Sequence, residues 1–134
     1  MVRVDTNAAV HVAAFRAALR AFLRETEIAA REGGLTPQRY LLLLMIKGAP
    51  DGSQQATVSE LVERLGLAQS TVTELVNRAA DAGLIEREPS GHDGRVAHVR
   101  LTAEGERRLA LSFSRLEFER ERLRVAFSEL DGEA

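Results

Sequence analysis

Apolar residues recur at helical spacing along most of this chain, and an alternating pattern occurs only once. The first helical stripe lies between Asn7 and about Arg31, and it is formed by Val12, Phe15, Leu19 and Phe22. Arginine and glutamate fall mostly off this stripe, as on an amphipathic helix. Gly33 and Gly34 follow it and predict the end of the helix.

The next helix is the most apolar part of the chain. In "LTPQRYLLLLMIKG", Thr36 stands at the N-cap position, Pro37 at the first helical position and Gly48 just past the end. A nearly uninterrupted apolar run between them predicts a central, buried helix. The segment "APDGSQQA" is rich in turn-forming residues and predicts a loop.

Two short amphipathic helices are predicted after that loop. Thr57 and Glu60 have capping-box spacing at the start of the first one. The sequence "GLAQ" separates it from a second helix, from about Gln69 to Ala82, which Gly83 ends. The second helix should be buried through Val72, Leu75, Val76 and Ala79. Two such helices across a short turn containing glycine predict a helix-turn-helix.

The alternating pattern follows immediately. "LIERE" and "VAHVRL" are extended runs on either side of a loop of Pro, Ser, Gly and Asp, which predicts a small β-hairpin. Helical spacing resumes at Thr102, and leucines recur every seven residues with phenylalanines beside them: Leu109, Leu116, Leu123 and Leu130, with Phe113 and Phe127. This repeat predicts one long terminal helix. Its apolar stripe could be buried within one chain or between two, and we favour two chains.

Composition limits the class of protein. With 134 residues, 28% charged and 45% hydrophobic, residues 1–134 are expected to form a single globular domain. There is no cysteine, which excludes disulfides and thiolate metal sites. The N-terminal stretch has no signal-peptide pattern, so we expect a cytoplasmic protein without a membrane partner. A net charge of −2 excludes binding to polyanions by bulk attraction alone.

The order of these elements resembles the MarR family of bacterial transcriptional regulators. The resemblance rests on "LTPQRYLLLLMI", "TVSELVERLGLAQSTVTELVNRAADAGLIERE", "DGR" and "LTAEGERRL", which cover about Leu35 to Leu109. It implies a mainly α fold with a small β-hairpin. The winged helix-turn-helix lobe would span residues 35–102, and long dimerisation helices would span residues 1–34 and 103–134.

The resemblance also implies a function. Members of this family bind a pseudo-palindromic DNA operator as homodimers. The helix at about 69–82 would enter the major groove, and the wing, residues 86–100, would reach a flanking minor groove. Many members are repressors that a small molecule releases. A homodimer, a double-stranded operator and a small-molecule effector are therefore the expected partners, and no cofactor is expected.

Candidate DNA contacts follow from the predicted helix. If Val72, Val76 and Ala79 point inward, a step of about 100° per residue turns the polar side chains outward. The expected DNA-binding residues are Gln69, Ser70, Thr71, Thr73, Glu74, Asn77 and Arg78, with Arg95 in the wing. Amide, hydroxyl and carboxylate groups of this kind read base edges or phosphates. The alternative is an ordinary solvated helix face.

The wing supplies one further cation and departs from the family pattern. Arg95 leaves the loop as a long donor suited to a narrow minor groove. Asp93 is expected to brace it, or to brace Arg87 across the hairpin. Gly94 stands where relatives often carry a second arginine. Ala68 stands where they often have a Ser or Thr cap, and Glu74 where they are frequently basic.

Three other functions were considered. Catalysis is not expected, because His11, His92 and His98 are scattered and no nucleophile or phosphate loop accompanies them. His92 and His98 could share a metal with Asp93, which would make the protein a metal-responsive regulator. A winged helix that binds protein instead of DNA is the third alternative.

A ligand pocket is expected between the terminal helices and the lobe. Its lining would come from Phe15, Leu19, Phe22, Tyr40 and Leu44, with Arg16 or His11 beside them. The alternative is that these residues are ordinary core, because aromatic residues at helical spacing are usually buried.

Overall fold

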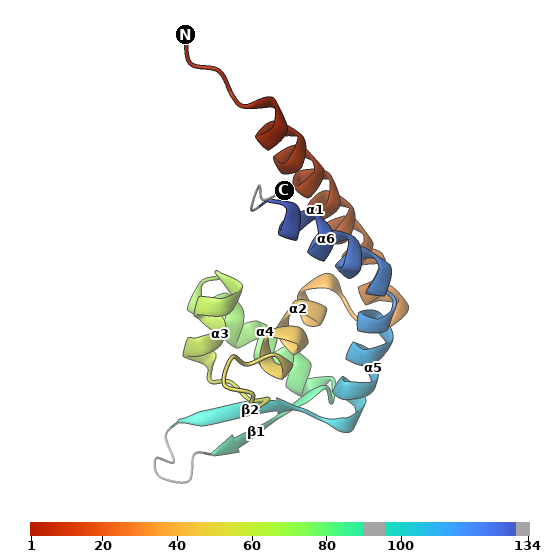
Figure 1. Ribbon diagram of the computed structural model, residues 1–134. Helices are drawn as coiled ribbons and strands as arrows, with labels where there is room; N and C mark the ends of the chain where they lie inside the picture. The colour runs from red at the N-terminus through yellow and green to blue at the C-terminus, as the bar shows by residue number, and fades with distance from the viewer. Residues whose placement is uncertain (90–95, 131–134) are drawn as a thin grey trace.

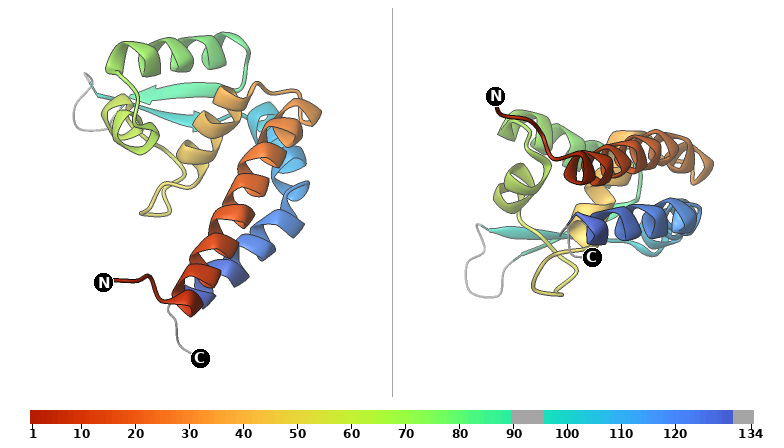
Figure 2. Two further views of the ribbon diagram at one scale, coloured as in Figure 1. Left: turned by 90° about the horizontal axis from the view of Figure 1, so that it is seen from above. Right: turned by 45° about the horizontal axis from the view of Figure 1, so that its top comes forward.

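The computed structural model describes residues 1–89 and 96–130. Six helices and two strands follow one another in the described residues: α1 (Thr6–Glu32), α2 (Pro37–Lys47), α3 (Val58–Leu65), α4 (Gln69–Asp81), β1 (Ile85–Pro89), β2 (Ala97–Leu101), α5 (Ala103–Ser114) and α6 (Glu117–Glu129). α2, α3, α4 and the hairpin form a winged-helix lobe, while α1 and α6 run side by side away from it (Figures 1 and 2). The mainly helical fold with one hairpin is confirmed.

Helices α2 and α3 begin and end where their local sequence signals predict. The Thr36 hydroxyl accepts a hydrogen bond from the Arg39 N–H, with Pro37 at the start of α2 and Gly48 at its end. Thr57 and Glu60 form a complete capping box at the start of α3. These interactions satisfy backbone groups that a helix end otherwise leaves unpaired.

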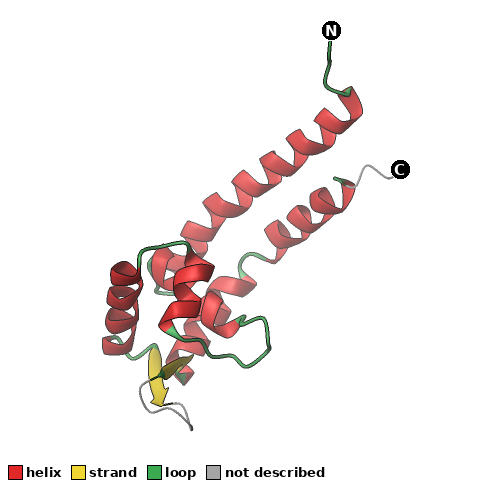
Figure 3. Ribbon diagram, turned by 90° about the vertical axis from the view of Figure 1, so that its left-hand side faces the viewer, coloured by secondary structure: helices red, strands yellow, loops and turns green. Residues whose placement is uncertain are grey.

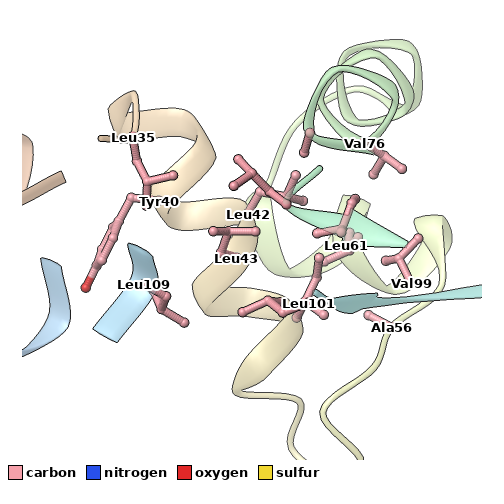
Figure 4. Close-up of a cluster of buried hydrophobic side chains, with 14 of the residues drawn as sticks. Leu35, Tyr40, Leu42, Leu43, Ala56, Leu61, Val76, Val99, Leu101 and Leu109 are labelled. Carbon is pink, nitrogen blue, oxygen red and sulfur yellow. The ribbon is translucent and has the colours of Figure 1, made fainter. Parts of the chain in front are cut away.

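The core lies around α2. Leu42, Leu43 and Ile46 are fully buried between α3, α4, the hairpin and α5. Figure 4 shows how Leu61, Val76 and Val99 close this cluster from the other elements of the lobe. The apolar run in the sequence therefore marks the central helix, as predicted.

The hairpin is antiparallel, with Ile85 opposite Leu101 and Pro89 opposite Ala97. A third segment joins it, because Ala56 pairs with Val99 through hydrogen bonds of 3.1 and 2.8 Å. For the residues before α3 the sequence predicted only a loop. A bridge made by the single residue Ala56 leaves no alternating pattern, so the sequence carried no sign of it.

The prediction of one long terminal helix is wrong, because the chain turns between α5 and α6. Leu116 is fully buried there, and its N–H donates to the Phe113 carbonyl at 3.1 Å. The Arg120 guanidinium donates to the same carbonyl and lies 3.7 Å from the centre of the Phe113 ring. The turn lets α5 pack on α2 and the hairpin while α6 packs along α1. Neither glycine nor proline marks it.

Candidate nucleic-acid interface

Helix α4 has one face in the core and one face in solvent. Val72, Val76 and Ala79 are at most 1% exposed. The opposite face carries polar side chains that are all exposed: Gln69, Ser70, Thr71, Thr73, Glu74, Asn77 and Arg78. The structure thus brings the seven predicted helix residues together on one open surface. A row of this kind can present hydrogen-bonding groups to the edges of base pairs.

The sequence around α4 explains how the helix is held. Gly66 ends α3 in the left-handed conformation at φ 68°, which a residue with a side chain adopts only at a cost. Ala68 then precedes α4 and gives it no side-chain cap. At the other end the Leu84 N–H donates to the Ala79 carbonyl at 3.0 Å, so that β1 starts directly beneath the helix. Figure 3 shows the hairpin next to the helix-turn-helix.

Within residues 1–89 and 96–130, two polar contacts on this surface engage residues of the predicted DNA-binding set. Glu74 and Arg78 form an ion pair of 3.3 Å one turn apart on α4. The Arg87 guanidinium, on β1, donates a hydrogen bond to Oδ1 of Asn77. From the sequence, Arg87 was instead predicted to be a partner of Asp93.

The wing tip lies outside the described residues. The predictions for Asp93 and Arg95, for Gly94 and for a metal shared by His92 and His98 therefore stay predictions. His98 itself is half-buried on β2. Among residues 1–89 and 96–130, no three histidine or acidic side chains form a group that could hold a metal ion.

Most of the positive charge near the interface is already paired. Arg100 lies 3.6 Å from Glu88 on the outer face of the hairpin, and Arg64 lies 4.0 Å from Glu60 on α3. Arg78 and Arg87 have the partners given above. Each arginine described between residues 57 and 100 thus has a polar side-chain partner within the chain. This surface offers hydrogen-bonding groups more than unpaired charge.

The five predicted ligand-pocket residues do not line one cavity. Phe15 and Phe22 line an open apolar groove of about 490 Å³ between α1 and α6, where the Phe15 and Phe127 rings lie 6.1 Å apart. Leu44 lines a separate pocket of about 300 Å³ between α2 and α5. Leu19 is half-buried, and Tyr40 is 2% exposed within the core. Burial raises the pKa of the Tyr40 hydroxyl, and the charge of Arg120 opposes that shift.

Several residues that line these cavities were not predicted from the sequence. The groove includes Arg120, Leu123 and Arg124, and the smaller pocket includes Lys47, Glu106 and Phe113. Lys47 is the single lysine of the chain, and its Nζ lies 2.9 Å from Oε2 of Glu106. The leucine repeat could have pointed to Leu123. The other residues meet only because the chain turns between α5 and α6.

A helix-turn-helix followed directly by a β-hairpin defines a winged helix-turn-helix. Residues 33–96 match the family model described as the MarR family. The winged helix-turn-helix of this chain is therefore similar to that of the MarR family, which confirms the resemblance seen in the sequence. No curated protein sequence matches the chain. No helix in the described part of the chain is both long enough and apolar enough to span a membrane.

Solved structures of the same fold extend the likeness to the terminal helices. A cysteine-to-serine variant of MarR from E. coli, complexed with operator DNA, is 20% identical with a TM-score of 0.65, over 81% of this chain and 75% of that one. The YusO protein from Bacillus subtilis is 26% identical with a TM-score of 0.63, over 89% and 90%. The transcriptional regulator MosR from M. tuberculosis, in complex with DNA, is 24% identical with a TM-score of 0.60, over 82% and 77%.

Proposed function

We propose that this chain is a transcription regulator that binds double-stranded DNA in a sequence-specific way. The observation that carries the proposal is the exposed polar face of α4, backed by a fully buried face and flanked by a hairpin. Helix α4 enters the major groove, and the wing, residues 86–100, reaches the neighbouring minor groove. Two structures with this fold were solved with DNA bound, which supports the proposal.

The chemistry of α4 suits base reading. Gln69 and Asn77 carry amides that can pair with adenine or with other base edges. The hydroxyl groups of Ser70, Thr71 and Thr73 can serve bases or phosphates. Thr73 and Asn77 are one helical turn apart, so their side chains follow the same groove.

We propose that the regulator is a homodimer. Residues 35–102 form the DNA-binding lobe of each protomer, and residues 1–34 and 103–134 provide the dimer contact. Several large apolar side chains of these terminal helices are at least 40% exposed: Val10, Val12, Leu23, Ile28, Leu111, Phe113, Phe118, Val125 and Phe127. An apolar surface of this extent is typical of an interface between chains.

We further propose that the protein is a repressor, acting in the cytoplasm, whose operator binding a small molecule relieves. The pocket of about 300 Å³ lies where α2 of the lobe meets α5, and its wall is mostly apolar around the Lys47–Glu106 pair. A ligand there would separate the two helices and change the spacing of the two lobes. The test is a panel of small aromatic acids, scored by operator release. The acids should no longer bind to, or release DNA from, the Ala110→Phe variant, because its larger side chain fills the pocket.

The deciding experiment for DNA binding is selection from a random duplex pool with the purified full-length chain. We expect dyad-symmetric sites whose half-site centres lie about one helical turn apart, roughly 34–36 Å. Wild-type protein that shows no sequence preference at low salt would contradict the proposal and favour the protein-binding alternative.

A further inference from the structure

The strand register places Arg87 on the inner face of the hairpin. Alternate residues of a strand share a face, and Arg87 is two positions after Ile85, which is 3% exposed. Its partner across the sheet is Val99, which is 2% exposed. Arg87 itself is exposed because it lies beyond the edge of the core. Its side chain is therefore directed toward α4, where it reaches Asn77.

The chemistry of this contact fixes the orientation of the Asn77 amide. A guanidinium has N–H donors and no acceptor, so only the amide oxygen can face it. The hydrogen bond has a charged donor, which makes it stronger than a neutral one. Turning the amide over would bring its NH₂ group against a cation. The oxygen is thus held toward β1, and the NH₂ group is directed away from the strand.

We propose that Arg87 is a positioning residue that sets base specificity through Asn77. This inference rests on the proposed DNA binding and deepens it. With its oxygen held by Arg87, Asn77 presents its NH₂ donor to the duplex. It then selects a base pair with an acceptor at that point of the major groove, such as a purine N7, guanine O6 or thymine O4. A free amide could turn over and accept from cytosine N4 or adenine N6 as well.

The competing role for Arg87 is a plain phosphate contact. Such a contact contributes equally on every sequence and appears in the salt dependence of binding. A positioning role instead appears at one base pair in each half-site. The two roles therefore differ in which measurement they change.

The experiment compares Arg87→Met, Asn77→Ala and the double variant on the operator selected by the wild-type chain. Arg87→Met keeps an unbranched stem and removes the donors. The matched control is Arg100→Met, on the opposite face of the hairpin beside Glu88. Because Arg100 belongs to the same wing, this variant is expected to lower affinity on every sequence while leaving the Asn77 amide in place. Affinity is measured for all four base pairs at each operator position. We expect wild type to discriminate by about tenfold at the Asn77 position. Arg87→Met and Asn77→Ala should lose that preference, the double variant should lose no more, and Arg100→Met should keep it.

A second readout needs no DNA. The side-chain NH₂ resonances of Asn77 in the free protein should shift in Arg87→Met and stay in place in Arg100→Met. Unchanged base preference in Arg87→Met, with a uniform loss of affinity and a shallower salt dependence, would overturn the inference alone. A wild-type chain that selects no duplex would overturn the proposed function and this inference together.

Discussion

At the scale of single residues, Gly105 sets how closely α5 approaches the end of α4. A Cβ at this position would lie 2.1 Å from the Leu84 carbonyl oxygen and 3.1 Å from its carbon. The Thr102 N–H donates a hydrogen bond of 3.0 Å to the same carbonyl, so Leu84 cannot move away without breaking that bond. Gly105 is therefore needed for packing, although it lies in the first turn of a helix.

Gly105→Ala should destabilise the protein. Helix propensity alone predicts the opposite, because alanine in a helix is favoured over glycine by about 0.5–1 kcal/mol. The clash with backbone should outweigh this and lower the free energy of unfolding by about 1–3 kcal/mol, as overpacking does. Urea unfolding followed by circular dichroism measures it. Gly66→Ala is the comparison, because no atom lies within 4 Å of its added Cβ and only the φ of 68° opposes it. A stabilised Gly105→Ala would contradict the prediction.

Glu104 gives the stability of the protein a defined pH dependence. Hydrogen bonds from Arg107 and Arg108 lower the pKa of Glu104 from 4.5 to about 2. Because the pKa is lower in the folded state, the stabilisation is complete above about pH 4.5 and is lost as the pH falls toward 2. The difference in free energy of unfolding between wild type and Glu104→Gln should shrink over this window. Both proteins are compared by urea unfolding from pH 7 downward. A difference that is constant with pH would show that the pairing is not formed.

The exposed residues of α4 could be predicted from the sequence, but the side-chain contacts between elements could not. The outward set on α4 follows from three buried positions and the helical period, so the sequence sufficed. The partner of Arg87 depends on the angle between α4 and β1, which no local pattern encodes. Its face could have been predicted, since Arg87 and Ile85 share strand parity, but its contact with Asn77 could not.

At the scale of elements, helix α4 starts without a side-chain cap. Ala68 provides no side-chain hydrogen bond to the first turn of α4, whereas Thr36, Thr57 and Thr102 cap α2, α3 and α5. Ala68→Ser should accept from an N–H of that turn and raise the free energy of unfolding by about 1 kcal/mol. Thr57→Ala is the reverse control and should lower it by about the same amount. Urea unfolding of the three proteins measures both effects, and no gain in Ala68→Ser would contradict the first.

Element boundaries were predictable where a local signal sets them. Proline, glycine and capping threonines act within one turn, so the bounds of α2 and α3 can be read from a few letters. The turn between α5 and α6 is tertiary in origin. Leu116 keeps the seven-residue repeat, yet it is buried in the turn between the two helices. Arg120 donates a hydrogen bond to the Phe113 carbonyl, which lies at this turn. The seven-residue repeat therefore predicted the apolar positions correctly, but it wrongly predicted one continuous terminal helix.

At the scale of the molecule, α1 and α6 leave apolar surface on both sides of their pair. One groove holds Phe127, which is 63% exposed, and the other holds Phe118, which is 72% exposed. Burying either ring against a second chain would remove a large apolar area from water.

The full-length chain should sediment at about twice its mass of 14.7 kDa. Phe118→Glu and Phe127→Glu each place a charge in one groove, and at least one of them should yield folded monomers, because an unpaired charge is costly to bury. Leu41→Glu is the control, since Leu41 is 40% exposed on α2, outside the terminal helices that we propose for the dimer contact. Sedimentation equilibrium measures the mass, and circular dichroism confirms folding. Dimers that persist in both variants would place the interface elsewhere.

The charge of the whole molecule predicts an unusually shallow salt dependence of DNA binding. Net charge is −2, and Arg78 on the exposed polar face of α4 is paired with Glu74 at 3.3 Å. Glu74→Gln should release this arginine to a phosphate in each half-site. Each added phosphate contact steepens the slope of log affinity against log salt by about 0.9, or roughly 1.8 for a dimer. Nonspecific affinity at low salt should rise as well.

The control is Glu63→Gln, at an exposed position on α3. It removes the same charge without touching the Glu74–Arg78 pair and should leave the slope nearly unchanged. Fluorescence anisotropy across a salt series measures all three proteins. Equal slopes for Glu74→Gln and Glu63→Gln would show that Arg78 does not reach the DNA backbone.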